Sequence, residues 1–273
     1  MVTSSRPRSR TFWARKVHRY LGLCIGVQFI AGTVGGLYFS WTNLDEVHGD
    51  HLQAPRPHLR GDVALVSPGS VLESIRLREP VDSLVGINLA EVLGTPTYRV
   101  QYFSGAQRRS QLADATTGSL RTPVGRDEAV RIAQRGFAYP AAVRQVEYLT
   151  QDSVGRHHEY RAQPLPAWAV SFDHPSRATA YVPVELGVVQ RVRADRWRIF
   201  DFLWMLHTMD YAGRDNFNNL LLRAFSVLGL LTIGSGFLLF VVTSRPYRRR
   251  GRASRQESTR TRITSDAPSA SGA

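Results

Sequence analysis

Two long runs without a charged residue constrain this chain more than any other feature. The first, YLGLCIGVQFIAGTVGGLYFSW, covers residues 20–41, and the second, AFSVLGLLTIGSGFLLFVVT, covers residues 224–243. A helix of about 20 residues is about 30 Å long, which matches the hydrocarbon core of a bilayer. The two runs therefore predict two transmembrane helices. Trp13 and Trp41 would lie near the ends of the first helix, where interfacial aromatic residues gather.

The net charge of +13 is concentrated at the two ends of the chain. Residues 1–19 carry six basic residues and no acidic residue, and residues 245–273 carry eight arginines against two acidic residues. The segment between these ends is nearly neutral, so we expect no nucleic-acid partner. Two buried core helices of a soluble protein would leave the charged ends unexplained, whereas the positive-inside rule places both ends in the cytoplasm.

The expected location is therefore the inner (plasma) membrane, with both termini cytoplasmic and the central segment outside. The first run is too long for a cleaved signal peptide, and no A-x-A-like site follows it, so it predicts an uncleaved anchor. The single cysteine, Cys24, lies within this run, so the outer segment must be stabilised by an apolar core without a disulfide. Residues 244–273 are polar and arginine-rich, which predicts a disordered tail that contacts the lipid bilayer or only sets the topology.

The segment between the two runs contains two units with the same order of elements, a helix followed by antiparallel strands. In the first unit, residues 42–124, a linker leads to a short helix at SPGSVLESI, which Ser67 can cap. The alternation of Tyr98, Val100 and Tyr102 is typical of a half-buried strand. The strands expected in this unit cover residues 83–93, 96–103 and 109–122.

The second unit, residues 125–195, opens with GRDEAVRIAQRGF, in which Ala129, Ile132 and Ala133 form one helical face. Each unit has a turn glycine near its end, at positions 118 and 187. The strands expected in the second unit cover residues 143–151, 167–174, 178–185 and 187–193. Residues 196–223 then predict an amphipathic segment along the outer membrane interface.

DEAVRIAQ at 127–134, followed by strands, and the closing DATTGSL at 114–120 resemble the PepSY domain, a small helix-plus-sheet module found outside the membrane. Asp114, Thr117 and Gly118 match the closing turn of that family, whereas PVELGVV in the second unit lacks the Asp and the Thr. ARKVHRYLGLCIG resembles the start of PepSY-associated membrane proteins. The resemblance implies two transmembrane helices that flank an extracytoplasmic tandem of PepSY-like helix-plus-antiparallel-sheet units. Familiar members have more membrane helices, so this chain resembles a reduced form.

Four histidines lie near the expected membrane boundaries. His207 stands among apolar residues in DFLWMLHTMDY, His48 and His51 follow the first run, and His18 precedes it. A histidine in an apolar setting needs a partner, which is a backbone carbonyl, an acid such as Asp210, a lipid headgroup or a metal. About 30 Å of helix separates His18 from the other three, so His18 would need a second subunit to share a cofactor with them.

Members of the resembled family include haem-containing membrane reductases that act on ferric siderophores. The resemblance implies that His207 and either His48 or His51 are axial ligands of a b-type haem, with His18 as the one candidate on the inner side. The second apolar run contains no histidine, which departs from that pattern. The structural alternatives are an interfacial anchor for His207, snorkelling for His18 and a plain loop for HGDH at 48–51.

Two functions remain open from the sequence. One is haem-dependent, membrane-linked electron transfer or reduction of a ferric complex. The other is non-enzymatic: the PepSY-like units bind a protein or peptide partner, such as a protease that they restrain. Catalytic motifs of hydrolases and kinases are absent from the sequence.

Glycine pairs in the first apolar run form two GxxxG motifs, which let helix backbones approach closely. These pairs are Gly22 with Gly26 and Gly32 with Gly36. They predict packing of the two membrane helices on each other or a homodimer.

Overall fold

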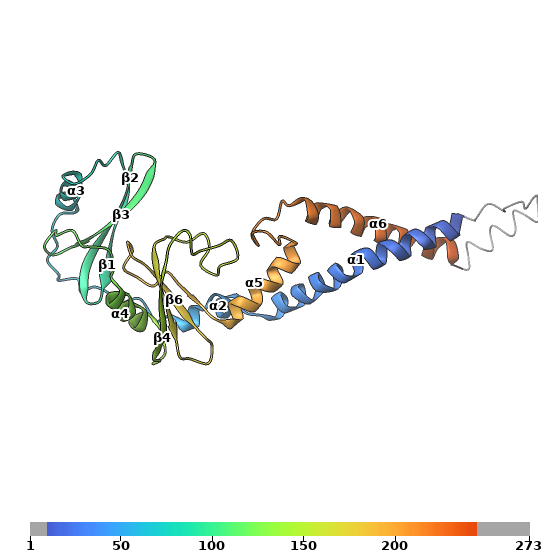
Figure 1. Cartoon of the computed structure of the whole chain (residues 1–273), viewed down its shortest axis with the longest axis horizontal. Coiled ribbons are helices and arrows are strands. Elements are labelled where there is room, and N and C mark those ends of the chain that lie inside the picture. Colours follow the sequence, from blue (N-terminus) through green and yellow to red (C-terminus); the bar gives the residue numbers. More distant parts are fainter. Residues whose placement is uncertain (1–9, 245–273) are drawn as a thin grey trace, which may run out of the picture. The chain divides into compact units, whose positions relative to one another are not determined.

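The computed structural model describes residues 10–244 (Figure 1). These residues form two compact units. The helix unit contains residues 10–34, 208–210 and 216–244, and the sheet unit contains residues 35–207 and 211–215. Residues 1–9, which carry part of the basic N-terminal charge, and residues 245–273, for which we predict disorder, lie outside the described residues.

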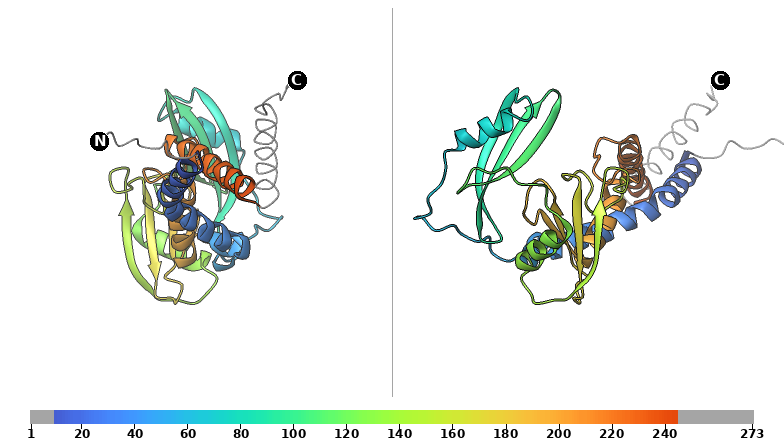
Figure 2. Two further views of the ribbon diagram at one scale, coloured as in Figure 1. Left: turned by 90° about the vertical axis from the view of Figure 1, so that its right-hand side faces the viewer. Right: turned by 60° about the vertical axis from the view of Figure 1, so that its left-hand side comes forward.

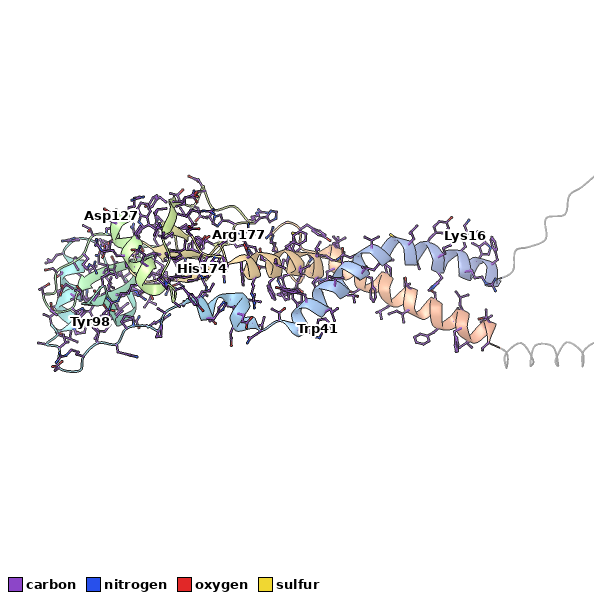
Figure 3. The ribbon with its side chains drawn as sticks, turned by 90° about the horizontal axis from the view of Figure 1, so that it is seen from below. Lys16, Trp41, Tyr98, Asp127, His174 and Arg177 are labelled. Atoms are coloured by element: carbon purple, nitrogen blue, oxygen red, sulfur yellow. The ribbon has the colours of Figure 1, made fainter. Side chains whose placement is uncertain are left out.

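Two helices are long and apolar enough to cross a membrane, α1 (Arg10–Trp41) and α6 (Leu220–Thr243). Both helices end at the predicted residues, Trp41 and Thr243. Helix α1 begins ten residues before the apolar run, because the basic segment before it contains neither Pro nor Gly and continues the helix. Figure 3 shows Lys16 toward one end of α1 and Trp41 toward the other. Helix α6 begins four residues early, where the Asn219 side chain caps it by accepting a hydrogen bond from the Leu222 N–H.

The first module of the sheet unit consists of α3 (Pro68–Arg76) and an antiparallel sheet in the order β1-β2-β3. Its strands are β1 (Ser83–Val92), β2 (Thr95–Ser104) and β3 (Gln107–Asp114). The predicted Ser67 cap is confirmed, since its hydroxyl accepts a hydrogen bond from the Gly69 N–H. Tyr98, Val100 and Tyr102 alternate on the buried face of β2, where Val71 and Ile75 of α3 share their core.

Strand β3 ends at Asp114, eight residues before the predicted end at residue 122. The reason is local hydrogen bonding: Asp114 Oδ1 accepts from the Thr116 and Thr117 N–H groups, and the Gly118 N–H donates to the Asp114 carbonyl. These bonds reverse the chain into a turn, which Gly118 completes with a φ of +78°.

The second module consists of α4 (Arg126–Gly136) and a sheet in the order β4-β5-β6-β7. Its strands are β4 (Val143–Leu149), β5 (Ala167–Phe172), β6 (Thr179–Pro183) and β7 (Arg191–Arg193). The predicted α4 face of Ala129, Ile132 and Ala133 is buried in one core with Ala180 and Val182 of β6. Figure 2 shows this sheet and the sheet of the first module as separate bodies of strands.

Two short elements between α1 and α3 were not predicted, α2 (Leu44–His48) and the 3₁₀ turn η1 (Asp50–Leu52). Gly49 joins them with a φ of +81°, and a Cβ there would lie 2.9 Å from the Val192 carbonyl oxygen. The close approach of this glycine holds part of the predicted linker against β7.

Helix α5 (Asp195–Thr208) forms the first part of the predicted amphipathic segment, residues 196–208. Its aromatic side chains Trp197, Phe200 and Trp204 stack along one face. Phe39 of α1 packs on that face, with its ring centroid 4.8 Å from that of Phe200. Polar residues of α5 make ion pairs with other segments of the sheet unit: Arg196 with Glu46, Arg198 with Glu159 and Asp201 with Arg161. Tertiary contacts thus involve both the aromatic and the polar residues of the helix. Its position along a membrane interface stays a prediction.

Candidate functional site

His207 lies on the last turn of α5, over the glycines of α1. A Cβ on Gly36 would lie 3.9 Å from His207 Cε1, and a Cβ on Gly35 would lie 3.7 Å from His207 Cβ. The imidazole centroid is 5.7 Å from the ring of Phe39 and 6.4 Å from that of Trp204. Gly36, predicted to let helices approach, therefore faces the exposed His207 side chain.

His48 lies at the other end of α5. It ends α2, and its ring centroid is 5.7 Å from that of Trp197. Trp197 precedes His207 by ten residues, which is about 15 Å along the helix axis. His51 follows on η1, where it is exposed.

Axial ligands of one haem must bind opposite sides of a single iron. His207 and His48 do not converge in this way. In the described part of the chain, no group of three or more His, Cys, Asp or Glu residues could hold a metal ion. Because His48 and His207 lie near opposite ends of α5, these two do not fit as the axial ligands of one haem, whereas the pairing of His207 with His51 stays a prediction.

His18 joins the two long helices. Its Nδ1 lies 2.8 Å from the hydroxyl oxygen of Ser235, and a Cβ on Gly236 would lie 3.4 Å from its Cε1. The small residues of α6 thus make room for the imidazole of α1. His18 is therefore a helix-pairing residue in this structure.

The Gly22–Gly26 pair of α1 is uncovered. Within the described chain, no heavy atom lies within 4 Å of a Cβ built on either glycine. Packing inside one chain therefore does not use this motif, and the predicted homodimer through Gly22, Gly26, Gly32 and Gly36 stays a prediction.

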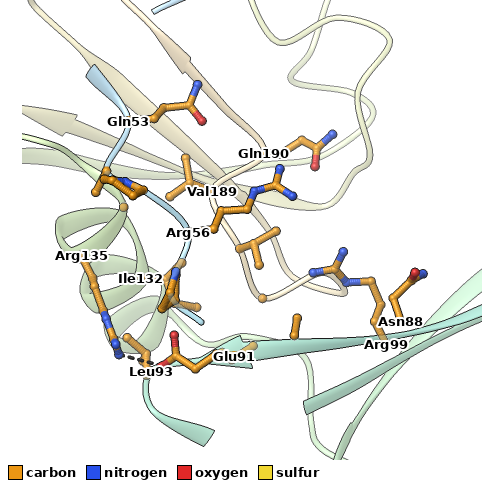
Figure 4. Close-up of a pocket in the computed structure, with 18 of the residues that line it drawn as sticks. Gln53, Arg56, Asn88, Glu91, Leu93, Arg99, Ile132, Arg135, Val189 and Gln190 are labelled. Carbon is orange, nitrogen blue, oxygen red and sulfur yellow. Dashed lines mark ion pairs between the residues drawn. The ribbon is translucent and has the colours of Figure 1, made fainter. Parts of the chain in front are cut away.

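A cleft of about 490 Å³ lies within the sheet unit (Figure 4). Its walls come from five parts of the chain: the segment 53–57, the second half of β1, Arg99 of β2, the end of α4 and the loop 187–190. Modules one and two both contribute, so the cleft exists only when the two modules are packed together.

Two arginines on different walls bring positive charge into the cleft. Arg99 projects from β2, and Arg56 comes from the segment before α3 (Figure 4). Arg99 Nη2 donates a hydrogen bond of 2.8 Å to the Leu186 carbonyl, whereas its buried Nε has no partner among the described residues. Burial, and then the neighbouring charge of Arg56, lower the pKa of Arg99. Neither arginine has an ion-pair partner in residues 10–244.

Glu91 is the acidic residue of the cleft. Its side chain is 5% exposed, and Oε1 accepts a hydrogen bond from the Gly94 N–H and forms an ion pair with Arg135, whose Nη1 lies 2.8 Å away. The other oxygen, Oε2, is buried and has no partner within the described chain. Arg99 and Glu91, which both line the cleft, thus each keep one buried polar atom without a partner in the described chain.

Sequence reasoning missed this cleft. Arg99 stands between Tyr98 and Val100, where period-two alternation indicates a solvent-facing residue. The second module covers that face in the folded chain. The sequence contains one weak signal for the cleft, which is the presence of charged residues, Glu91 and Arg99, on two adjacent strands.

A second polar cluster lies between α5 and the second sheet. The Tyr181 hydroxyl donates a 2.6 Å hydrogen bond to Glu159, and Arg198 pairs with the same carboxylate at 2.7 Å. Burial, and then the charge of Glu159, raise the pKa of Tyr181. Asp201 pairs with Arg161 and Arg214. Each of these carboxylates has a partner, and these ion pairs attach α5 to the rest of the second module, whereas Arg214 Nε is buried without a partner in the described chain.

No family model, curated protein or solved structure matches this chain. The resemblance to PepSY proteins therefore stays a prediction from the motifs, and the function must be inferred from the residues and their geometry.

Proposed function

We propose that this chain is a membrane-anchored binding protein, whose sheet unit holds a protein or peptide partner in the cleft of Arg56, Arg99 and Glu91. In this proposal α1 and α6 span the inner membrane, both termini are cytoplasmic, and the sheet unit is an extracytoplasmic PepSY-like tandem. Restraint of a protease is one form that such binding would take.

The observation that carries the proposal is the pair of unpartnered polar atoms in the cleft, Arg99 Nε and Glu91 Oε2. A buried polar group without a partner costs about 1–3 kcal/mol. A bound ligand that supplies both an acceptor and a donor would recover that free energy. The shared order of helix and strands in the two modules supports the PepSY-like assignment.

Photocrosslinking tests the proposal in intact cells. A photoreactive amino acid replaces Ala90, which lines the cleft, and in a matched control it replaces Ala106, exposed on the β2–β3 turn of the same module. We expect a discrete protein adduct from position 90 that is absent from position 106. Equal adducts at both positions, or no adduct at position 90, would contradict partner binding in the cleft.

Reporter fusions test the topology. A reporter that works only in the cytoplasm should be active when it is fused after residue 273. Activity of an outside-only reporter at the same position would contradict the proposed orientation.

A visible spectrum tests the redox alternative separately. Because His207 and His48 lie at opposite ends of α5, we expect a featureless reduced-minus-oxidised spectrum for the detergent-purified chain from haem-replete cells. A near-stoichiometric Soret band that disappears in His207→Ala would restore the haem reading and weaken the binding proposal.

A further inference from the structure

One side of the cleft is the free edge of a sheet. Strand β1 pairs with β2 from Ser83 to Val92, and among residues 10–244 no other backbone group bonds to its outer side. Residues 88–92 of this strand line the cleft. An edge strand presents a row of unpaired N–H and C=O groups, onto which an extended peptide can add as a further strand.

The exposed side chains of β1 do not protect this edge. Leu84, Val85 and Leu89 are 47%, 45% and 42% exposed. Natural edge strands are usually blocked by charges, by proline or by a covering segment. An apolar edge of this kind is consistent with a partner that covers it.

Charge selects the kind of peptide. The cleft is lined by three arginines against one glutamate, and that glutamate is already engaged by Arg135. Arg56 and Arg99 remain without a carboxylate among the described residues. Guanidinium groups prefer carboxylates, which they can bind through two hydrogen bonds.

Glu91 distinguishes a peptide from a simple anion. A small anion would supply an acceptor for Arg99, but it has no donor for Glu91 Oε2, which would stay unpaired. A peptide main chain supplies N–H donors beside its carbonyl acceptors. An acidic peptide therefore matches both unpaired atoms of the cleft at once.

We infer that the cleft takes an extended acidic peptide segment, whose main chain pairs with the outer edge of β1 and whose carboxylate binds Arg99 and Arg56. Five residues of β1 line the cleft, so the paired segment would be about 17 Å long. This inference rests on the proposed function of the cleft and names the chemistry of its ligand.

The test uses the full chain in detergent and fluorescein-labelled peptides of seven residues. The acidic probe alternates Val and Asp and has an amidated C-terminus, and its matched control alternates Val and Asn. Fluorescence anisotropy should show that the acidic peptide binds at least about tenfold more tightly, as expected for a charge-assisted hydrogen bond. Equal affinities would overturn the inference.

Three variants locate the carboxylate. Arg99→Gln should weaken binding of the acidic probe about tenfold or more, and the exposed Arg56→Gln should weaken it several-fold, by about one charged contact. Arg78→Gln removes an exposed arginine that does not line the cleft, so it should leave the affinity unchanged. Because Arg99 also holds the Leu186 carbonyl, Arg56→Gln keeps the test valid if Arg99→Gln fails to fold. Equal effects of Arg56→Gln and Arg78→Gln would overturn the inference.

Two further probes separate the source of the carboxylate and the role of the main chain. The Val-Asn peptide with a free C-terminus reports whether a terminal carboxylate can replace the Asp side chains. It would then bind more tightly than the amidated Val-Asn peptide. If it does not, the carboxylate must come from the Asp side chains of the acidic probe. Methylation of alternate backbone nitrogens in the acidic probe should abolish most of the affinity, since it removes the hydrogen bonds to β1. Unchanged binding of the methylated probe would overturn the pairing with β1.

The outcomes also separate this inference from the proposed function. A specific adduct at position 90 together with equal binding of the acidic and neutral peptides would leave partner binding intact and overturn the acidic ligand. The absence of both the adduct at position 90 and the preference for the acidic peptide would overturn the proposed function together with this inference.

Discussion

The two modules of the sheet unit end in similar glycine turns that are stabilised in different ways. Gly118 and Gly187 both have positive φ, +78° and +63°. In the first module, Asp114 Oδ1 accepts hydrogen bonds of 2.8 and 3.1 Å from the Thr116 and Thr117 N–H groups. In the second module, the turn is packed: a Cβ on Gly187 would lie 3.2 Å from Leu112 Cδ1.

Solvent exposure explains this difference. Thr116 and Thr117 of the first turn are exposed, whereas Leu186 and Gly187 of the second turn are buried against the first module. An exposed turn has few packing contacts and needs polar side chains to hold its backbone. A buried turn is held by its neighbours, so it can dispense with the Asp and Thr that made the first turn resemble the PepSY motif.

The sheets of the two modules also differ in burial, and the sheet of the second module is the more buried. Strand β2 alternates, with Val100 buried and Gln101 partly exposed, so one face of its sheet forms the core. All five residues of β6 are buried, because α4 covers one face of its sheet and the Glu159–Arg198 cluster covers the other. The second module is thus more enclosed than the first.

The largest expected effect comes from aspartate substitutions in these two strands. Tyr181→Asp and Val182→Asp in β6, and Val100→Asp in β2, should each lower the free energy of unfolding by more than about 4 kcal/mol, because each buries an unpaired charge. Gln101→Asp should cost less than about 1 kcal/mol. Urea unfolding of the detergent-solubilised chain measures the four values. A tolerated Tyr181→Asp would mean that β6 has an open face.

Alanine at the two turn glycines should have the next largest effect. Gly118→Ala should cost about 1–2 kcal/mol, which is the strain of a left-handed conformation. Gly187→Ala adds a clash with Leu112 and Val92, so it should cost about 1–3 kcal/mol more. The same urea unfolding measurement compares the two variants. Equal losses of unfolding free energy would show that the contacts of Gly187 relax without penalty.

Effects of similar or smaller size, and of opposite sign, should come from the carboxylates of the two turns. Asp114→Ala removes several hydrogen bonds and should cost about 1–2 kcal/mol at neutral pH. Glu185→Gln removes a charge that burial disfavours, and should stabilise the chain by up to about 1 kcal/mol. Destabilisation by Glu185→Gln would instead indicate that the hydrogen bond from the Ser110 backbone and the charge of Arg109 outweigh the cost of burial.

The pH dependence should separate the two carboxylates. The hydrogen bond from the Thr116 side chain lowers the pKa of Asp114, so its contribution is present above its unfolded pKa of about 3.9 and is lost as the pH falls through the lower folded value. Burial raises the pKa of Glu185, so stability falls as the pH rises from about 4.3 through its folded value. The effect of Asp114→Ala should therefore fade below about pH 4, and that of Glu185→Gln should appear above it. Parallel pH profiles of the two variants would refute this assignment.

Local patterns determined much of the fold from the sequence. The ends of α1 and α6, the Ser67 cap and the alternation in β2 follow from apolar runs, a capping hydroxyl and period-two burial. These signals act within one element, so a single sequence is sufficient to recognise them.

Only the tertiary structure decided the candidate site. Arg56, Glu91, Arg99 and Arg135 come from four separate segments, and contact between the two modules brings them to one cleft. The tertiary structure also decided the positions of His207 and His48, which the sequence placed on one side of the membrane and the fold placed at opposite ends of α5. Periodicity tells which face of an element is apolar, but the residues that cover the other face are set by long-range packing, which no local pattern encodes.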